Sequence, residues 1–579
     1  MSKNLSTEQK RLEENYSNQK NWLKWGPYIS ERQWATVRED YSADGDAWNY
    51  ITHDMSRSKT YRWGEDGIAG ISDDKQRICF ALTLWNGNDP ILKERLFGLT
   101  PANGNHGEDV KELYYYLDNT PTHSYMKYLY KYPQQAFPYA ELEEKNKHRS
   151  RLQDEYEIID TGIFNEGKYF DVFIEYAKNN EEDICIKITV HNRCNLKAPI
   201  VLMPTLWMRN LWAFNLENEK PVIELINEDS NTSEAFIYTP KLGAYQFYFQ
   251  TPERVLFTEN ETNTERLYNI PNKNPFVKDI FHEAVISNNF NLPENKKSGT
   301  KFAPFYRYNV DGIGSVSIKL RLSKTKLNNP LGKDFDEIFK SRMQEANEFY
   351  DQLITTKNED LKNIQRQAYA GMLWNKQFYY IDIPSWLKGD EGQPPPPQER
   401  LNGRNSKWLT LNNEDIISMP DKWEYPWYAA WDLPFHCLPL ASLDPQFAKN
   451  QLLLLLREWY MNPYGQIPAY EWNFSDVNPP VQAWACMQVY KAEKKSLGKG
   501  DTLFLERVFQ KLLINFTWWV NRKDRQDNNV FEAGFLGLDN IGVFDRNNVP
   551  EGGSLEQADG TAWMGMYCLD MMEIALELA

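Results

Sequence analysis

Residues 169–192 read YFDVFIEYAKNNEEDICIKITVHN, and this stretch decides the fold of the first half of the chain. Apolar and polar residues alternate in both halves of the stretch, which is typical of β-strands with one buried face. Further strands of this kind are EAFIYTP (234–240), AYQFYFQ (244–250), RVLFTEN (254–260) and GSVSIKLRL (314–322), with turn residues between them. The pattern predicts an antiparallel β-sandwich.

The residues ahead of this stretch continue the β pattern. Ile78–Trp85 (ICFALTLW) is the near-continuous apolar run of a buried strand, and it ends in the turn signal Asn86-Gly87. Residues 104–139 are dense in Tyr, His and Pro, and we interpret them as loop. His106 and His123 match no zinc spacing, so no metal site and no cofactor are expected. Residues 1–330 are therefore predicted to form an N-terminal β-sandwich-type domain.

The period of the pattern changes after residue 330. Asp336–Leu353 has the spacing of an amphipathic helix, so residues 331–358 are expected to be a linker helix. Six further helices are predicted, over Glu359–Phe378, Tyr428–Ser442, Pro445–Trp459, Pro479–Lys495, Asp501–Val520 and Ser554–Leu578. The long loops between them carry many Trp, Asp, Glu and Asn residues, and loops of this kind are where functional residues concentrate.

The composition argues against several classes of partner and site. The net charge is −16, so nucleic acid and anionic membrane are not expected as main partners. The first twenty residues are polar and the longest aliphatic run, Leu452–Leu456, is too short to span a bilayer, which predicts a cytoplasmic protein. The six cysteines are scattered without a CxxC pair, so we expect reduced, buried thiols.

The chain is rich in aromatic residues, with 20 Trp, 33 Tyr and 29 Phe, and this enrichment bears on function. Such rings fill large cores, and they also line clefts that bind the apolar C–H faces of sugars. There is no GxSxG nucleophile motif and no phosphate-binding GxxxxGK[ST] loop. The candidate functional groups are instead carboxylates and amides set among aromatic residues: Trp431, Asp432, Glu471, Trp472, Asp476, Asn478, Asp539 and Asn540.

Glycoside hydrolysis needs two carboxyl groups, one to protonate the leaving oxygen and one to act as nucleophile or to activate water. The acid must keep its proton near neutral pH, so it needs surroundings that raise its pKa. Asp539 lies in the Gly-broken apolar run GFLGLDNIGVF, whose neighbouring residues could do this. The plainer alternative is that such carboxylates cap helices, form turns or pair with cations.

The chain resembles the bacterial members of glycoside hydrolase family 63, the family of processing α-glucosidase I. The stretches that carry the resemblance are WDLPFH (431–436), REWYMNPYGQIPAYEWNFSDVNPP (457–480) and FEAGFLGLDNIGVFDR (531–546). ERLFGLT, GNHGEDVKE and PTHSYMKYLYKYPQ in the first half are similar to the family too. The resemblance implies a β-sandwich joined to an (α/α)6 toroid barrel, and an inverting, exo-acting mechanism that releases α-linked glucose from oligosaccharides.

In related α-glucosidases the general acid is the first Asp of a Gly-hydrophobic-Asp-Asp/Asn loop, which Gly537-Leu538-Asp539-Asn540 matches. The resemblance thus implies Asp539 as general acid. It implies a sugar subsite lined by Trp431, Asp432, Glu471, Trp472, Asp476, Asn478 and Asn540.

Residues 359–579 depart from the family in supplying only about half of the barrel's helices, so the chain is expected to be a truncated form. The general base, a Glu, is expected beyond the C-terminus, and these 579 residues alone are expected to hydrolyse α-glucosides negligibly. Two alternatives stay open: a non-catalytic carbohydrate-binding or scaffold protein, and trehalase-like or mannosylglycerate-type hydrolysis on the same barrel.

Overall fold

The computed structural model describes residues 5–32, 38–42, 46–105, 109–214, 216, 218–229, 231–390, 394–403, 405–423, 428–469, 477–522, 531 and 560–579. The chain divides into two compact units. The first contains Met1–Phe378, Gly389–Pro397 and Asp421–Pro426, and the second contains Tyr379–Lys388, Gln398–Pro420 and Trp427–Ala579.

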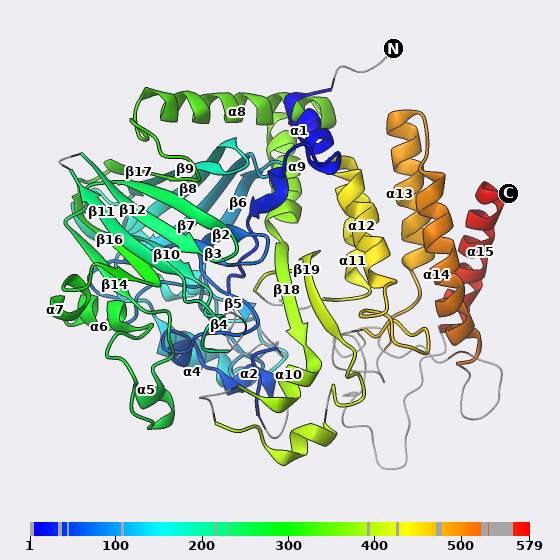
Figure 1. The fold of residues 1–579 in the computed structure, drawn as a ribbon, viewed down its shortest axis with the longest axis horizontal. Helices are drawn as coiled ribbons and strands as arrows, with labels where there is room; N and C mark the ends of the chain where they lie inside the picture. Colours follow the sequence, from blue (N-terminus) through cyan, green and yellow to red (C-terminus); the bar gives the residue numbers. More distant parts are fainter. Residues whose placement is uncertain are drawn as a thin grey trace. The chain divides into compact units, whose positions relative to one another are not determined.

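Two large antiparallel sheets form the first unit (Figure 1). The strand order of the six-stranded sheet is β1 (Trp25–Gly26), β2 (Ile68–Asp73), β3 (Ile78–Trp85), β10 (Ala198–Met208), β16 (Lys301–Val310), β14 (Arg254–Thr258). The order of the nine-stranded sheet is β15 (Ser298–Gly299), β11 (Val222–Glu228), β12 (Thr232–Thr239), β13 (Gly243–Gln250), β17 (Ser315–Ser323), β9 (Asp183–Asn192), β8 (Tyr169–Asn180), β7 (Tyr125–Pro133), β6 (Tyr114–Asn119). A small third sheet pairs β4 (Gly98–Leu99) with β5 (Asp109–Val110).

Both large sheets contribute to one hydrophobic core. The ring of Phe80 on β3 lies 6.2 Å from that of Tyr176 on β8, and Phe302 on β16 lies 6.1 Å from Phe247 on β13. On β9 every second side chain from Ile184 onward is buried, as the alternating pattern predicts. The strands predicted in residues 169–322 are thus confirmed, and they pair antiparallel.

The interpretation of residues 104–139 as loop is wrong for β6 and β7, which pair with each other. In β7 the rings of Tyr128, Tyr130 and Tyr132 are fully buried at a spacing of two. Tyrosine favours strands, and its hydroxyl can be satisfied in a core: that of Tyr130 donates to Glu112. Counting Tyr as a loop-forming residue therefore hid a buried strand.

Helices cover parts of the first unit. They are α1 (Thr7–Tyr16), α2 (Ala47–Tyr50), α3 (His53–Ser56), α4 (Tyr139–Lys147), α5 (Thr264–Tyr268), α6 (Ile280–Ile286), α7 (Asn291–Glu294), α8 (Lys333–Leu353) and α9 (Glu359–Trp374). The amphipathic helix α8 packs on β7, β8 and β9 through Phe335, Ile338 and Phe339. Contacts group α8 and α9 with the sheets. The domain boundaries 1–330, 331–358 and 359–579 stay predictions.

The second unit is mainly helical, with α10 (Ile383–Lys388), α11 (Asp432–Leu443), α12 (Pro445–Leu455), α13 (Gln482–Leu497), α14 (Thr502–Val520) and α15 (Gly560–Leu578). A two-stranded sheet of β18 (Lys376–Asp382) and β19 (Asn412–Ser418) precedes α11. Helix α11 contacts α12 and α13, and α13 contacts α14 and α15 (Figure 1). The six predicted helices are present as α9 and α11–α15, and the chain is a mixed β and α protein, while the (α/α)6 barrel stays a prediction.

Two properties expected of the whole chain can be compared with the described residues. None of their helices has both the length and the apolar character that crossing a membrane requires. All six cysteines are free thiols; five are buried, and the sixth, Cys568 on α15, is exposed, so the expectation of buried thiols fails there.

Candidate functional site

The first turns of three helices in the second unit meet through aromatic rings. Trp431 caps the N-terminus of α11, and its ring lies 5.3 Å from Trp563 in the first turn of α15, at an interplanar angle of 84°. It also lies 5.1 Å from Phe435, which in turn is 5.4 Å from Trp484 at the start of α13. Edge-to-face contacts at these distances are favourable. We call these four residues the aromatic cluster.

Backbone contacts hold the same helix ends together. The Ala430 N–H donates to the carbonyl of Ala469 at 3.1 Å. The buried side chain of Gln482, the first residue of α13, donates through Nε2 to the carbonyl of Ala430 at 3.1 Å. The segments that precede α11 and α13 are therefore tied to one another beside the aromatic cluster, which makes this helix end a defined surface.

Asp432 lies next to Trp431 in the first turn of α11. Burial raises the pKa of its carboxyl above the usual range, because a charged carboxylate loses hydration there. An acid at a helix N-terminus is stabilised by the helix dipole, which opposes this effect. The result is a partly desolvated carboxyl group beside aromatic rings, a combination that suits hydrogen bonding to sugar hydroxyls.

His436 follows Asp432 by one helical turn. Its Nδ1 lies 3.3 Å from the Ser418 hydroxyl at the end of β19. Burial lowers the pKa of His436 to about 4, so the ring is neutral at pH 7. It therefore adds no positive charge next to Asp432 and cannot act as the cationic acid of a neutral-pH reaction.

Three of the sequence-predicted site residues lie in the described part of the chain: Trp431, Asp432 and Asn478. Asn478 lies four residues before α13, and its side-chain oxygen is buried without a hydrogen-bond partner among the described residues. An unsatisfied buried amide oxygen is costly, and a ligand hydroxyl would satisfy it. A ligand hydroxyl at this position would complete the hydrogen bonding of Asn478.

The other predicted site residues, Glu471, Trp472, Asp476, Asp539 and Asn540, lie outside the described residues, so their roles stay predictions. In sequence, residues 471–476 precede α13 and residues 532–559 precede α15. These are two of the helices whose first turns carry the aromatic cluster.

Sequence reasoning singled out Trp431 but missed Phe435, Trp484 and Trp563. Each lies within the first four residues of its helix, and the signal that could have found them is a Trp or Phe placed just after a predicted helix start. That signal is weak by itself, because only the packing of α11, α13 and α15 brings the rings together.

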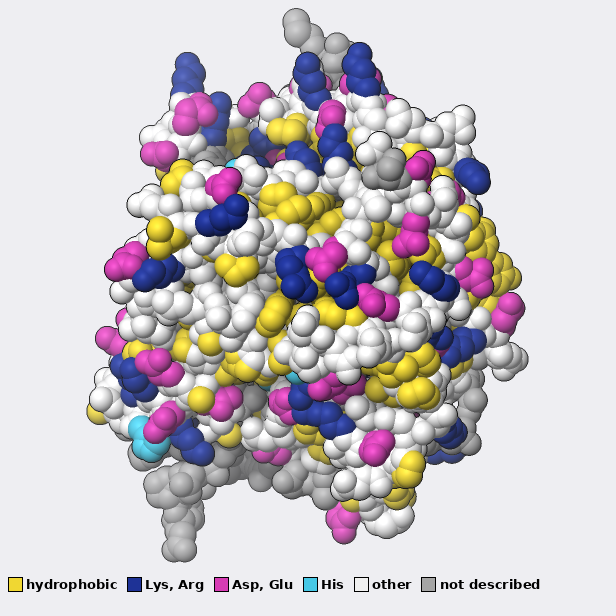
Figure 2. All heavy atoms as spheres, turned by 90° about the vertical axis from the view of Figure 1, so that its left-hand side faces the viewer, with side chains coloured by type: hydrophobic (Ala, Val, Ile, Leu, Met, Phe, Trp, Pro, Cys, Tyr) yellow, Lys and Arg dark blue, Asp and Glu magenta, His cyan; other side chains and the backbone are white. Residues whose placement is uncertain are grey.

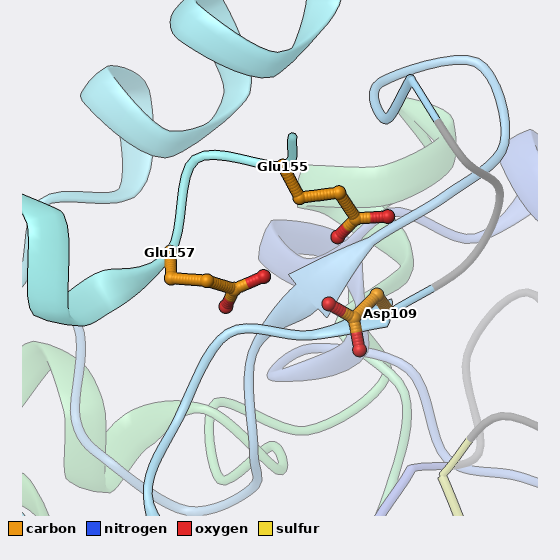
Figure 3. Close-up of side chains that lie close together, drawn as sticks. All are labelled: Asp109, Glu155 and Glu157. Carbon is orange, nitrogen blue, oxygen red and sulfur yellow. The ribbon is translucent and has the colours of Figure 1, made fainter. Parts of the chain in front are cut away.

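A group of carboxylates in the first unit has the spacing of a metal site. Asp109, Glu155 and Glu157 point toward one another (Figure 3). The Lys111 ammonium, however, lies 2.6, 2.5 and 2.8 Å from their oxygens. Burial lowers the pKa of the Lys111 ammonium, but the hydrogen bonds to these three carboxylates raise it by more, so the pKa lies above its usual value. The Lys111 ammonium thus lies where a metal ion would bind and pairs with all three carboxylates.

The surface charges are mixed. On the face shown in Figure 2, Lys and Arg side chains alternate with Asp and Glu, and its described residues form no broad basic area. The described residues of this face therefore do not favour binding of a phosphate backbone.

Comparison with known proteins points to carbohydrate chemistry. Residues 425–535 match the family model described as mannosylglycerate hydrolase MGH1-like glycoside hydrolase domain. This region contains α11, α12, α13 and α14. The match shows that this region is similar to a glycoside hydrolase domain; family 63 and a bacterial origin stay predictions.

The chain is also 48% identical over 622 aligned positions to a protein described as uncharacterized protein YMR196W of Saccharomyces cerevisiae. The match covers 99% of this chain and 57% of that protein, so the chain spans little more than half the length of this relative.

Solved structures show only distant similarity. A family GH92 α-mannosidase, BT3965 from Bacteroides thetaiotaomicron, matches 60% of this chain and 42% of its own at 11% identity and a TM-score of 0.24. A putative kojibiose phosphorylase from the human microbiome matches 63% and 45% at 10% identity and a TM-score of 0.20. A GH92 family glycosyl hydrolase, ccman5, matches 84% and 56% at 10% identity and a TM-score of 0.26.

Proposed function

We propose that this protein is part of an inverting, exo-acting glycoside hydrolase that cleaves an α-linked hexose from an oligosaccharide or small glycoside. The observation that carries the proposal is the aromatic cluster at the joined first turns of α11, α13 and α15, with Asp432 beside it. Rings at a helix end offer flat apolar faces to a sugar, and a desolvated carboxyl binds its hydroxyls.

Asp539 is the proposed general acid. Leu538 and Ile541 flank the Asp539-Asn540 pair, and apolar surroundings keep a carboxyl group protonated near neutral pH. It would give its proton to the leaving oxygen while a second carboxylate activates water on the opposite face of the ring. In inverting enzymes the two carboxyl groups are about 6.5–9.5 Å apart, which leaves room for that water.

The remaining predicted residues are proposed to bind the sugar. Trp431 and Trp472 would pack on its C–H faces, and Asp432, Glu471, Asp476, Asn478 and Asn540 would bind its hydroxyls. The unsatisfied Asn478 oxygen supports such a role.

The sugar itself is proposed to be α-glucose, by the resemblance to family 63. A specific observation favours a second candidate, because the family matched by residues 425–535 is described by mannosylglycerate hydrolase. An α-mannosyl or α-glucosyl group on a small organic acid is therefore included as a substrate class.

The test is hydrolysis by the longest protein that the gene encodes, with α-glucobiosides, mannosylglycerate and α-glucosyl fluoride as substrates. Proton NMR identifies the anomer released first, and β-sugar from an α-glycoside shows inversion. Asp539→Asn is expected to lower kcat on the glycosides by about 10²–10⁴-fold. It should slow the fluoride far less, since fluoride leaves without protonation.

Asp545→Asn, in the same segment, is the matched control and should keep activity. Sugar binding without turnover of any of the three substrates would replace the proposal by the carbohydrate-binding alternative. Equal loss on glycoside and fluoride would show that Asp539 does not act as the acid.

A further inference from the structure

A pocket of about 490 Å³ lies on the first unit, apart from any residue considered so far. Its walls come from the segment after β10, which holds Asn210, Trp212 and Phe214, and from the segment after β14, which holds Glu261, Thr262 and Asn274. The size falls within the ~300–1,000 Å³ range of small-molecule sites. The pocket is open to solvent and is formed within one unit, so it does not depend on the hydrolysis proposed above.

Glu261 and Trp212 form its most ordered wall. The indole Nε1 of Trp212 donates to Glu261 Oε1 at 3.1 Å, and Lys220 Nζ donates to the same oxygen at 2.7 Å. The other oxygen, Oε2, has no hydrogen-bond partner among the described residues. A carboxylate fixed through one oxygen presents the second as an acceptor of set direction. The indole is partly buried against the core, so its position is fixed as well.

Hydrogen bonds within the protein fix the amide and hydroxyl groups of the pocket in position. Asn210 Nδ2 donates to the carbonyl of Asn260 at 2.8 Å, and its Oδ1 accepts from the Ala213 N–H at 3.0 Å. The Thr262 hydroxyl lies 2.7 Å from that of Thr60. Asn274 Oδ1 accepts from a backbone N–H at 2.9 Å, which leaves its Nδ2 as a donor toward solvent. Groups held in this way recognise a ligand with little loss of entropy.

The charged side chains that line the pocket balance, so they do not favour an ionic ligand. One acidic and one basic side chain line it, Glu261 and Lys273, and Lys220 already neutralises Glu261. A neutral ligand rich in hydroxyl groups matches a wall of acceptors and donors beside Trp212 and Phe214. We propose that this pocket binds a neutral hexose ring, with Glu261 Oε2 accepting from its hydroxyls and the aromatic side chains contacting its C–H face.

The experiment is titration calorimetry of the whole chain with D-glucose, D-mannose, maltotriose and D-glucuronate. At least one neutral sugar should bind, and Glu261→Gln, which keeps the shape of the side chain, should weaken that binding tenfold or more. Asn274→Ala should weaken it about two- to fivefold, as for loss of one neutral hydrogen bond. Glucuronate should bind no more tightly than glucose, since the one acidic and one basic side chain that line the pocket balance and offer its carboxylate no net positive charge.

Glu265→Gln on α5 is the matched control, since this exposed carboxylate does not line the pocket, and it should bind as wild type does. Thermal unfolding of each variant confirms that it is folded. The proposal is overturned if none of the neutral sugars binds, if Glu261→Gln binds them as wild type does, or if glucuronate binds more tightly than glucose.

Discussion

In the first unit, the rings of Tyr116 and Trp374 stack at 5.6 Å and 14°, and Trp374 is only 1% exposed. In the second unit, Trp431 and Trp563 are partly buried at the ends of helices, and Phe435 is 36% exposed. Aromatic side chains thus fill a core between a sheet and α9 in the first unit, whereas in the second unit they lie partly exposed at the ends of helices. The difference shows that an excess of aromatic residues indicates sugar binding only where the rings stay accessible.

The largest expected effect is on the turnover number, and it comes from the proposed catalytic residue Asp539. In the longest protein that the gene encodes, Asp539→Asn should lower kcat on α-glycosides by about 10²–10⁴-fold because proton donation to the leaving group is lost. The melting temperature should change by no more than it does in Asp545→Asn. A large drop in melting temperature with unchanged kcat would assign Asp539 to structure and weaken the comparison.

The next effect is on stability, in the region where rings form the core. Trp374→Ala should lower the free energy of unfolding by about 3–5 kcal/mol, since it leaves a cavity and removes the hydrogen bond from Nε1 to the Asp118 carbonyl at 3.0 Å. Urea unfolding followed by circular dichroism measures this. A loss under about 1 kcal/mol would show that the Tyr116–Trp374 stack is not part of a tight core.

A pH effect should follow from the buried His436. Burial lowers its pKa to about 4, whereas an unfolded histidine has a pKa near ~6.5. Between these values the unfolded state binds more protons, so stability is lost as the pH falls from about 6.5 to about 4, by up to about 3 kcal/mol.

The measurement for His436 is urea unfolding at pH 7, 5.5 and 4. His436→Gln should flatten this part of the pH profile, whereas His148→Gln, at the exposed end of α4, should leave its slope unchanged. If His436→Gln keeps the wild-type slope, the ring is not shielded from solvent as the structure indicates.

The smallest effect is the sharpest test of the comparison. Trp563→Ala should cost less stability than Trp374→Ala, but it should weaken binding of the hydrolysed sugar about tenfold, equivalent to about 1.4 kcal/mol. Calorimetry gives the sugar affinity and urea unfolding gives the free energy of unfolding, and both are measured for Trp563→Ala and Trp374→Ala. If Trp563→Ala is as destabilising as Trp374→Ala and leaves sugar affinity unchanged, the aromatic cluster is a second core and the comparison fails.

Periodicity predicted α11–α15 and several long strands of the first unit, but it did not single out the strands β10 and β16. The alternation in residues 169–192 matches β8 and β9, and the apolar run at 78–85 matches β3, because burial on a sheet imposes a spacing of two. The predicted start of one helix at Pro445 matches that of α12, which follows the capping Asp444. β6 and β7 were missed since tyrosine is common both in loops and in strands, and only the partner sheet decides which it forms.

The candidate site shows the same division. Trp431, Asp432 and Asn478 could be chosen from short motifs, because a carboxylate or amide among aromatic residues stands out in the chain itself. Phe435, Trp484 and Trp563 are ordinary helix residues in sequence, and they form a surface only because α11, α13 and α15 pack with their first turns together. Likewise, the acidic Asp109, Glu155 and Glu157 could be chosen as metal ligands from chemistry alone, but the position of Lys111 gives them another cation.

Local pattern thus determined the elements and the chemistry carried by each segment. Which side chains face one another depends on contacts between residues far apart in sequence, and only the tertiary structure decided it.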